Sequence, residues 1–133
     1  MNSFDALYAE ILRTNRNDER IPIAIVPNVA VTEKVVVGFP LEVIGIKLVA
    51  ETQPDSSTGT YLLTVAAAGN NLLAVANFDL ETLVADTPQT PALTATAADL
   101  ILAADALVTF TLTSNNLDLT GAGLQIVLQY RAR

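Results

Sequence analysis

The carboxylates Asp79 and Glu81, in the stretch NFDLE, form the pair whose spacing comes nearest to acid–base chemistry. In an extended segment, residues two positions apart point to the same side, and paired carboxylates can act as general acid and base in glycoside hydrolysis. A solvated strand end accounts for the same spacing. The sequence has no His and no Cys, which excludes Ser-His-Asp and Cys-His catalysis and His or thiolate metal sites. We therefore expect no enzyme activity and no cofactor.

Two polar stretches resemble fragments of cation-binding loops. Asp55 is followed by SSTG, and Asn115, Asn116 and Asp118 lie close together further along the chain. Neither stretch has the spaced acidic ligands and the terminal Glu of an EF-hand loop, so we interpret both as solvated loops. Neither GxGxxG nor GxxxxGK[ST] occurs, so no nucleotide site is indicated.

Charge is sparse and unevenly placed along the chain. The length of 133 residues is typical of one domain, and a composition of 51% hydrophobic and 16% charged residues is typical of a globular one. The formal net charge is −7. No Lys or Arg lies between Leu48 and Tyr130. An acidic body with basic ends suits termini that dock on a partner, although chance in a charge-poor chain gives the same layout. The negative balance argues against nucleic-acid binding.

Neither a signal peptide nor a membrane span is indicated. The first residues, MNSFDALYAE, lack a basic region followed by an apolar one. The uncharged run from Ser56 to Phe78 is long enough to cross a bilayer but is too rich in Thr, Asn and Gly. We therefore expect a soluble protein with no membrane partner.

The N-terminal residues have the pattern of a short amphipathic helix. Ser3 can cap its start, and the polar residues 14–20 end it. A helix this short is marginal alone and needs a surface, on its own domain or on a neighbour. We predict a helix or arm over residues 1–20 and a β domain over residues 21–133. The apolar residues at helical spacing are Phe4, Leu7, Tyr8, Ile11 and Leu12.

After Arg20 the sequence alternates between Val/Ile/Thr-rich segments and Pro, Gly or Asn turns, which predicts strands. About eight short strands at this spacing indicate an antiparallel sandwich or barrel. AGNN (68–71) and SNNLDLTGAG (114–123) are predicted to be hairpin turns. The predicted strands are Ile21–Val26, Val29–Val37, Leu41–Glu51, Tyr61–Ala67, Leu72–Asn77, Ala92–Thr96, Asp99–Leu102, Leu107–Thr113 and Leu124–Arg131.

The stretch ADLILAADALVTFTL (98–112) admits two readings. Ala and Leu favour one helix, whereas VTFTLTS alternates with period two and is rich in β-branched residues. Asp105, after two alanines, can serve as a turn residue. We predict a hairpin turned at Ala104–Asp105, with Val108, Phe110 and Leu112 facing the core.

From about Val35 onward, three stretches resemble the capsid cement, or head-decoration, proteins of tailed bacteriophages. They are TGTYLLTVAAAGNNLLAVANFDLETL (58–83), LTATAADLILAADALVTFTLT (93–113) and GAGLQIVLQYRAR (121–133). That family commonly has an Ala-Gly-Asp-type turn before a Thr-rich strand, and a last strand that ends on Tyr and a basic residue. Here Ala104 stands where Gly is usual.

The resemblance implies a jelly-roll-like β-sandwich that assembles as a dimer or trimer on the outer face of a capsid. Its partner would be the major capsid protein, and the protein would be made in the host cytoplasm and reside on the virion. Amphipathicity and charge, rather than the family pattern, indicate the residues that would reach the capsid or a neighbouring subunit. These are Phe4, Leu7, Tyr8, Ile11, Leu12, Arg13, Arg16 and Arg20. The alternative function is a small receptor- or glycan-binding module of a tail or fibre.

Overall fold

The computed structural model describes residues 17–23, 25, 30–55, 59–115 and 118–133. Within these residues the chain forms strands and two short 3₁₀ helices, η1 (Leu80–Thr82) and η2 (Ala97–Leu100). The strands are β1 (Asn17–Ile23), β2 (Ala30–Val36), β3 (Leu41–Val49), β4 (Thr52–Asp55), β5 (Tyr61–Ala67), β6 (Asn70–Asn71), β7 (Phe78–Asp79), β8 (Ile101–Leu102), β9 (Leu107–Ser114), β10 (Thr120–Ala122) and β11 (Leu124–Ala132).

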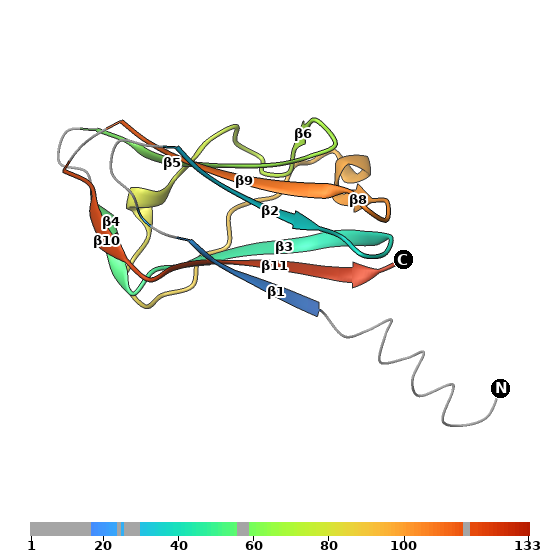
Figure 1. Cartoon of the computed structure of the whole chain (residues 1–133), viewed down its shortest axis with the longest axis horizontal. Coiled ribbons are helices and arrows are strands. Elements are labelled where there is room, and N and C mark those ends of the chain that lie inside the picture. The colour runs from blue at the N-terminus through green and yellow to red at the C-terminus, as the bar shows by residue number, and fades with distance from the viewer. Residues whose placement is uncertain (1–16, 24, 26–29, 56–58, 116–117) are drawn as a thin grey trace, which may run out of the picture.

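The strands form two facing sheets with a small two-stranded sheet at one side (Figure 1). The first sheet has the order β1-β11-β3-β8, and the second has the order β2-β9-β5-β6, with β7 also paired to β5. Strands β4 and β10 form the small sheet, and all these pairings are antiparallel. The chain passes repeatedly from one sheet to the other, as from β1 to β2 and from β2 to β3. The predicted all-β, antiparallel, jelly-roll-like sandwich is confirmed.

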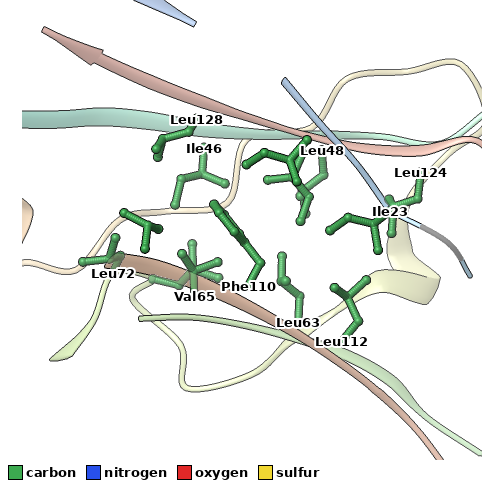
Figure 2. Close-up of a cluster of buried hydrophobic side chains, with 14 of the residues drawn as sticks. Ile23, Ile46, Leu48, Leu63, Val65, Leu72, Phe110, Leu112, Leu124 and Leu128 are labelled. Carbon is green, nitrogen blue, oxygen red and sulfur yellow. The ribbon is translucent and has the colours of Figure 1, made fainter. Parts of the chain in front are cut away.

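The core lies between the two sheets and consists almost wholly of aliphatic side chains. Strand β9 alternates as predicted, because Val108, Phe110 and Leu112 are fully buried whereas Thr111 and Thr113 are not. Figure 2 shows side chains from both sheets meeting here, with Phe110 reaching from β9 toward Ile46 and Leu48 on the opposite side. Because apolar residues alternate with period two, each sheet has one apolar face that is buried in the core.

The stretch 98–112 is neither one helix nor a hairpin. Residues 97–100 form η2, and the strands β8 and β9 follow, but β8 pairs with β3 whereas β9 pairs with β2 and β5. The predicted turn at Ala104–Asp105 is present and Asp105 has a φ of 68°. It carries the chain from one sheet to the other. Asp tolerates this left-handed conformation better than most residues, and Ala104, where the resembled proteins usually have Gly, does not have a positive φ.

Several predicted strands differ from the observed ones. Residues 72–77 and 92–96 pair only at the isolated bridge Leu73↔Leu93. Because Leu72 and Leu73 are both buried, this segment lacks the pleated alternation that a strand needs. Residues 114–123 are not a hairpin turn, since β9 and β11 belong to different sheets. The AGNN hairpin is confirmed, with φ of 52° at Ala68 and 80° at Gly69, as a type I′ turn requires.

The first strand lies earlier in the sequence than predicted. It runs from Asn17 to Ile23, rather than from Ile21 to Val26, and pairs along its length with β11. The polar residues NDER therefore belong to an edge strand, where one face and one edge meet solvent. The predicted division into an arm over 1–20 and a domain over 21–133 stays a prediction.

Candidate functional site: the apolar end of the sandwich

Most of the predicted partner-binding residues lie outside the described part of the chain. Arg20 alone lies within it, as an exposed residue of β1. The structure therefore does not test the predicted set, and its role stays a prediction. The residues outside the described part are Phe4, Leu7, Tyr8, Ile11, Leu12, Arg13 and Arg16.

Arg20 belongs to a cationic row on the outer face of its sheet. In the sheet register Arg20 pairs with Val127, which in turn pairs with Lys47. Both cations line a shallow depression of about 240 Å³, together with Gln125 and Pro88. Two neighbouring positive charges attract acidic groups, and the partner role predicted for Arg20 stays a prediction. The depression holds no group suited to catalysis.

Of the carboxylate pair, Asp79 has a structural role, whereas Glu81 takes part in it through its backbone and its buried Oε1 has no hydrogen-bond partner among the described residues. Asp79 ends β7, and its Oδ1 accepts a hydrogen bond of 3.0 Å from the backbone N–H of Glu81, which caps η1. The hydroxyl of Thr82 donates to the Asp79 carbonyl at 2.7 Å. The two residues therefore belong to a capped turn and do not share one face of a strand, as the sequence spacing suggested.

Of the other polar candidates, Asp55 is the last residue of β4, Asn115 and Asp118 lie between strands, and Asn116 lies outside the described part of the chain. The side-chain carbonyl of Asn115 accepts a hydrogen bond of 2.9 Å from the backbone N–H of Thr60, which ties two neighbouring loops together. Among the described residues no group of three or more acidic, His or Cys side chains could hold a metal ion. In that same part of the chain no helix has the length and apolar character needed to cross a membrane.

Tyr61 carries the one clearly perturbed titratable group in the described residues. It lies at the start of β5 with 1% of its surface exposed, and its hydroxyl has no hydrogen-bond partner there. Burial raises the pKa of Tyr61 from 10.0 to about 12, because the phenolate would lose its hydration. A phenol that is buried and held neutral cannot reach a substrate, so Tyr61 belongs to the core.

One end of the sandwich exposes most of the apolar residues that the core does not use. Six large apolar side chains are exposed in the described residues, and four of them lie around this end. We call these four, Val36, Phe39, Ile101 and Leu107, the apolar end. Val36 and Leu107 pair across β2 and β9, Phe39 lies in the β2–β3 turn, and Ile101 lies on β8. Figure 1 shows the β2–β3 turn, the β8–β9 turn and the C-terminus together at this end.

Backbone hydrogen bonds hold the apolar end together. Val37 donates to the Ala106 carbonyl at 2.9 Å, and Asp105 donates to the Val37 carbonyl at 2.7 Å. The backbone N–H of Arg133 reaches the Pro40 carbonyl at 3.0 Å. The two turns and the C-terminal strand are thus tied together at this end, where Val36 and Leu107 lie on the outer face of one sheet and Ile101 on the outer face of the other.

A groove opens into this end between the two sheets. It has a volume of about 170 Å³; most of its lining residues are apolar and Glu19 is the charged one, while polar and apolar atoms contribute about equally to its surface. The rings of Phe39 and Tyr130 flank it, with centroids 5.9 Å apart and planes tilted by 55°. We call it the end groove; its lining residues are Glu19, Val35, Val36, Val37, Gly38, Phe39, Leu41, Leu128 and Tyr130.

The two edge strands beside the groove are protected against strand addition. Glu19 on β1 pairs with the buried Leu128, and Glu33 on β2 pairs with the buried Phe110. Each glutamate therefore occupies an inward-facing position of an edge strand and is exposed there. Inward-facing charges on edge strands discourage edge-to-edge pairing. The apolar end, rather than a strand edge, is the surface suited to an apolar contact.

Sequence reasoning did not identify the apolar end, although two signals were present. Val35, Val36 and Val37 follow one another, so a strand through them must turn one valine outward. Phe39 lies in the turn sequence GFP, where a large aromatic residue has no core to enter. Neither signal shows that Ile101 and Leu107 lie at the same end, because that depends on how the two sheets face each other.

The comparisons with known proteins bear on the fold. No family model and no curated protein matches the sequence. By structure the chain is similar to a chain in the capsid asymmetric unit of cyanophage Pam1, with a TM-score of 0.52 and 14% identity over 89% of this chain and 82% of that chain. Two chains from structures of infectious bursal disease virus align at 12% identity. The chain from the Gx strain has a TM-score of 0.38 and aligns over 88% of this chain and 32% of its own length. The chain from the Gt strain has a TM-score of 0.29 and aligns over 90% of this chain and 30% of its own length. At these identities the likeness is one of fold.

Proposed function

We propose that this protein is a non-enzymatic structural component of a virion, a cement subunit on the outer face of a capsid shell. The observation that carries the proposal is the fold shared with a chain of a cyanophage capsid, which covers 89% of this chain and 82% of that one. Since most of both chains align, the similar chain has a comparable length and is not a large protein that merely contains such a domain. The sequence resemblance to phage cement proteins supports the same role.

In this role the subunit, a dimer or trimer, would bind the major capsid protein and bridge neighbouring capsomers. The N-terminal apolar residues, with Arg13, Arg16 and Arg20, would contact the shell or a neighbouring subunit. Arg20 and Lys47 on one sheet face support an acidic partner surface. Each contact is small, but many symmetric copies multiply weak contacts into stable attachment.

A glycan- or receptor-binding module has less support. Glycan sites usually present exposed aromatic rings. Among the described aromatic residues Phe39 is exposed, whereas Tyr61 and Phe110 are buried in the core. Phe39 also contacts Tyr130 at the end groove, so it does not form an open platform for a sugar.

The experiment mixes the purified protein with shells of the virus that encodes it, prepared without this protein. We expect the protein to sediment with the shells and to raise the temperature at which they come apart. The double variant Leu7→Ser/Ile11→Ser should bind more weakly, whereas Thr113→Ser, on an exposed part of β9, should bind like the wild type. Absence of both binding and stabilisation by the wild type would overturn the proposal, and specific hits on a glycan array would favour the alternative.

A further inference from the structure

The end groove lies where the N-terminal segment joins the sandwich. Asn17, the first residue of β1, pairs with Tyr130, and Glu19 pairs with Leu128. Glu19, Leu128 and Tyr130 also line the end groove. The chain that precedes Asn17 is therefore attached at the rim of this groove.

The N-terminal segment carries an apolar set that an apolar surface could accept. Its large apolar residues recur at helical spacing from Phe4 to Leu12, a stripe about 12 Å long in a helix. Residues 13–16, RTNR, are polar and separate this stripe from β1. Because a short amphipathic segment is marginal alone, burial of its stripe requires a nearby apolar surface. The apolar end is such a surface.

The size of the groove and the length of the link both fit the segment. A cavity of roughly 150 Å³ accommodates a benzene molecule, so the groove, at about 170 Å³, accommodates one leucine side chain or aromatic ring. A link of four residues spans up to about 13 Å when extended. Residues 13–16 are therefore long enough to let the chain reverse and bring Leu12 over the groove.

Charge also matches across the groove and the link. Glu19 is the charged residue of the groove lining, and Arg13 and Arg16 are the charged residues of the link. An exposed ion pair adds little stability, so its contribution is to orient the link beside β1. The burial of apolar surface supplies the driving force.

We propose that, in the free subunit, residues 4–12 of the same chain pack on the apolar end, with Leu12 in the end groove. A short link gives the segment an effective concentration of about 1 mM or more at its own groove. A second copy competes only at the bulk concentration of the protein, which favours the chain's own segment as the occupant. The contact protects Val36, Phe39 and Leu107 from water before any assembly takes place.

This inference does not depend on the virion role, because it concerns the isolated subunit. It does add a step to that role. If the same apolar residues contact a shell, they must first leave the end groove, so the shell contact replaces an existing contact. Failure of shell binding would leave the inference intact, and failure of the inference would leave the shell contacts possible.

The test uses a disulfide pair, which is specific because the chain has no Cys. The full-length double variant Leu12→Cys/Gly38→Cys places one thiol on the segment and one in the groove lining. A Cβ at Gly38 meets nothing within 4 Å, so the substitution fits. The control pair is Leu12→Cys/Thr113→Cys, because Thr113 is exposed and lies at the other end of β9 from Leu107.

After mild oxidation at low protein concentration, we expect on the order of ten-fold more intrachain disulfide in the Gly38 pair than in the control pair. Peptide mapping and a non-reducing gel identify the product as a monomer joined through residues 12 and 38. A disulfide-linked dimer would assign the groove to a second copy and overturn the proposal. Equal yields in the two pairs would overturn it as well.

A second measurement tests the same contact without cysteines. Leu7→Ser/Leu12→Ser should release the segment and raise the fluorescence of a dye that binds exposed apolar surface, such as ANS, several-fold. Thr14→Ser, in the polar link, is the matched control and should leave the fluorescence unchanged. Circular dichroism shows whether each variant keeps its β structure. A folded double variant with wild-type fluorescence would contradict the proposal.

Discussion

Apolar side chains occupy two different settings in this protein, the sandwich interior and the apolar end. In the interior, Ile46, Leu63 and Phe110 have no exposed surface. At the apolar end, Val36 is 59% exposed and Leu107 is 46% exposed, although both belong to the same sheet as Phe110. Within the described residues, folding buries the interior side chains completely, whereas the side chains of the apolar end keep exposed surface that another segment can cover.

The two settings differ in the free energy of burial that their side chains have already gained. Complete burial of one large aliphatic or aromatic side chain contributes about 1.5–3 kcal/mol. The interior has already gained this contribution, so substitutions there should reduce the free energy of unfolding. At the apolar end much of this free energy is still available, so substitutions there should weaken the contact with the N-terminal segment instead.

The largest expected effect is in the interior, at Phe110. Phe110→Ala removes a fully buried ring from the centre of the core and should lower the free energy of unfolding by about 3–5 kcal/mol, because transfer and cavity terms add. Urea denaturation followed by circular dichroism measures the loss. The control Thr113→Ala, on the exposed face of the same strand, should change stability by about 0.5 kcal/mol or less.

A loss at Phe110 no larger than that at Thr113 would remove the distinction between the two settings. It would mean that the interior is not packed as the structure has it. If Phe110→Ala does not fold, Phe110→Leu gives the smaller change that still tests the site.

The second effect is a pH dependence that arises from Tyr61, the buried residue of the interior whose pKa is raised. Burial holds its pKa at about 12 in the folded protein, compared with about 10 when exposed. Because the folded pKa is the higher one, this group favours folding below pH 10, and that contribution is lost as the pH rises from 10 through 12. The two pKa values correspond to roughly 2–3 kcal/mol. Urea denaturation at successive pH values measures it.

Tyr61→Phe is the matched control, since it removes the ionisable hydroxyl and keeps the ring. The variant should lose less stability than the wild type between pH 10 and 12. At pH 7 it should be as stable as the wild type or more so, because the buried hydroxyl has no hydrogen-bond partner among the described residues. Equal alkaline losses in the two proteins would place the hydroxyl in water.

The interior was largely predictable from the sequence because its pattern is local. Tyr61–Ala67 was predicted with its observed bounds, and Leu107–Thr113 and Leu124–Arg131 each fall one residue short. In these strands apolar residues alternate strictly, and alternation alone identifies both the strand and its buried face. The segment 72–77 failed this rule, because two adjacent leucines are buried there.

The apolar end was not predictable because it depends on which sheet each strand joins. The turn at Asp105 has the residue type and the φ that a hairpin turn could use, yet β8 and β9 join different sheets. A turn signal indicates that the chain changes direction but not which strand it then meets. Long-range pairing brings Ile101 and Leu107 to one end, and no local pattern encodes it.

The smallest effect on stability, and the sharpest test of the comparison, is at the apolar end itself. Val36→Ser/Leu107→Ser removes an exposed cross-strand pair. It should lower the free energy of unfolding by less than about 1 kcal/mol, the usual worth of such a pair. The same variant should weaken the contact of the N-terminal segment at the apolar end and so raise the fluorescence of ANS several-fold. Thr32→Ser, which lies on the outer face of the same sheet and has no apolar neighbour in its register, should keep both properties. A loss of stability as large as that of Phe110→Ala would show that the end belongs to the interior after all, because only residues already removed from water can contribute so much to folding.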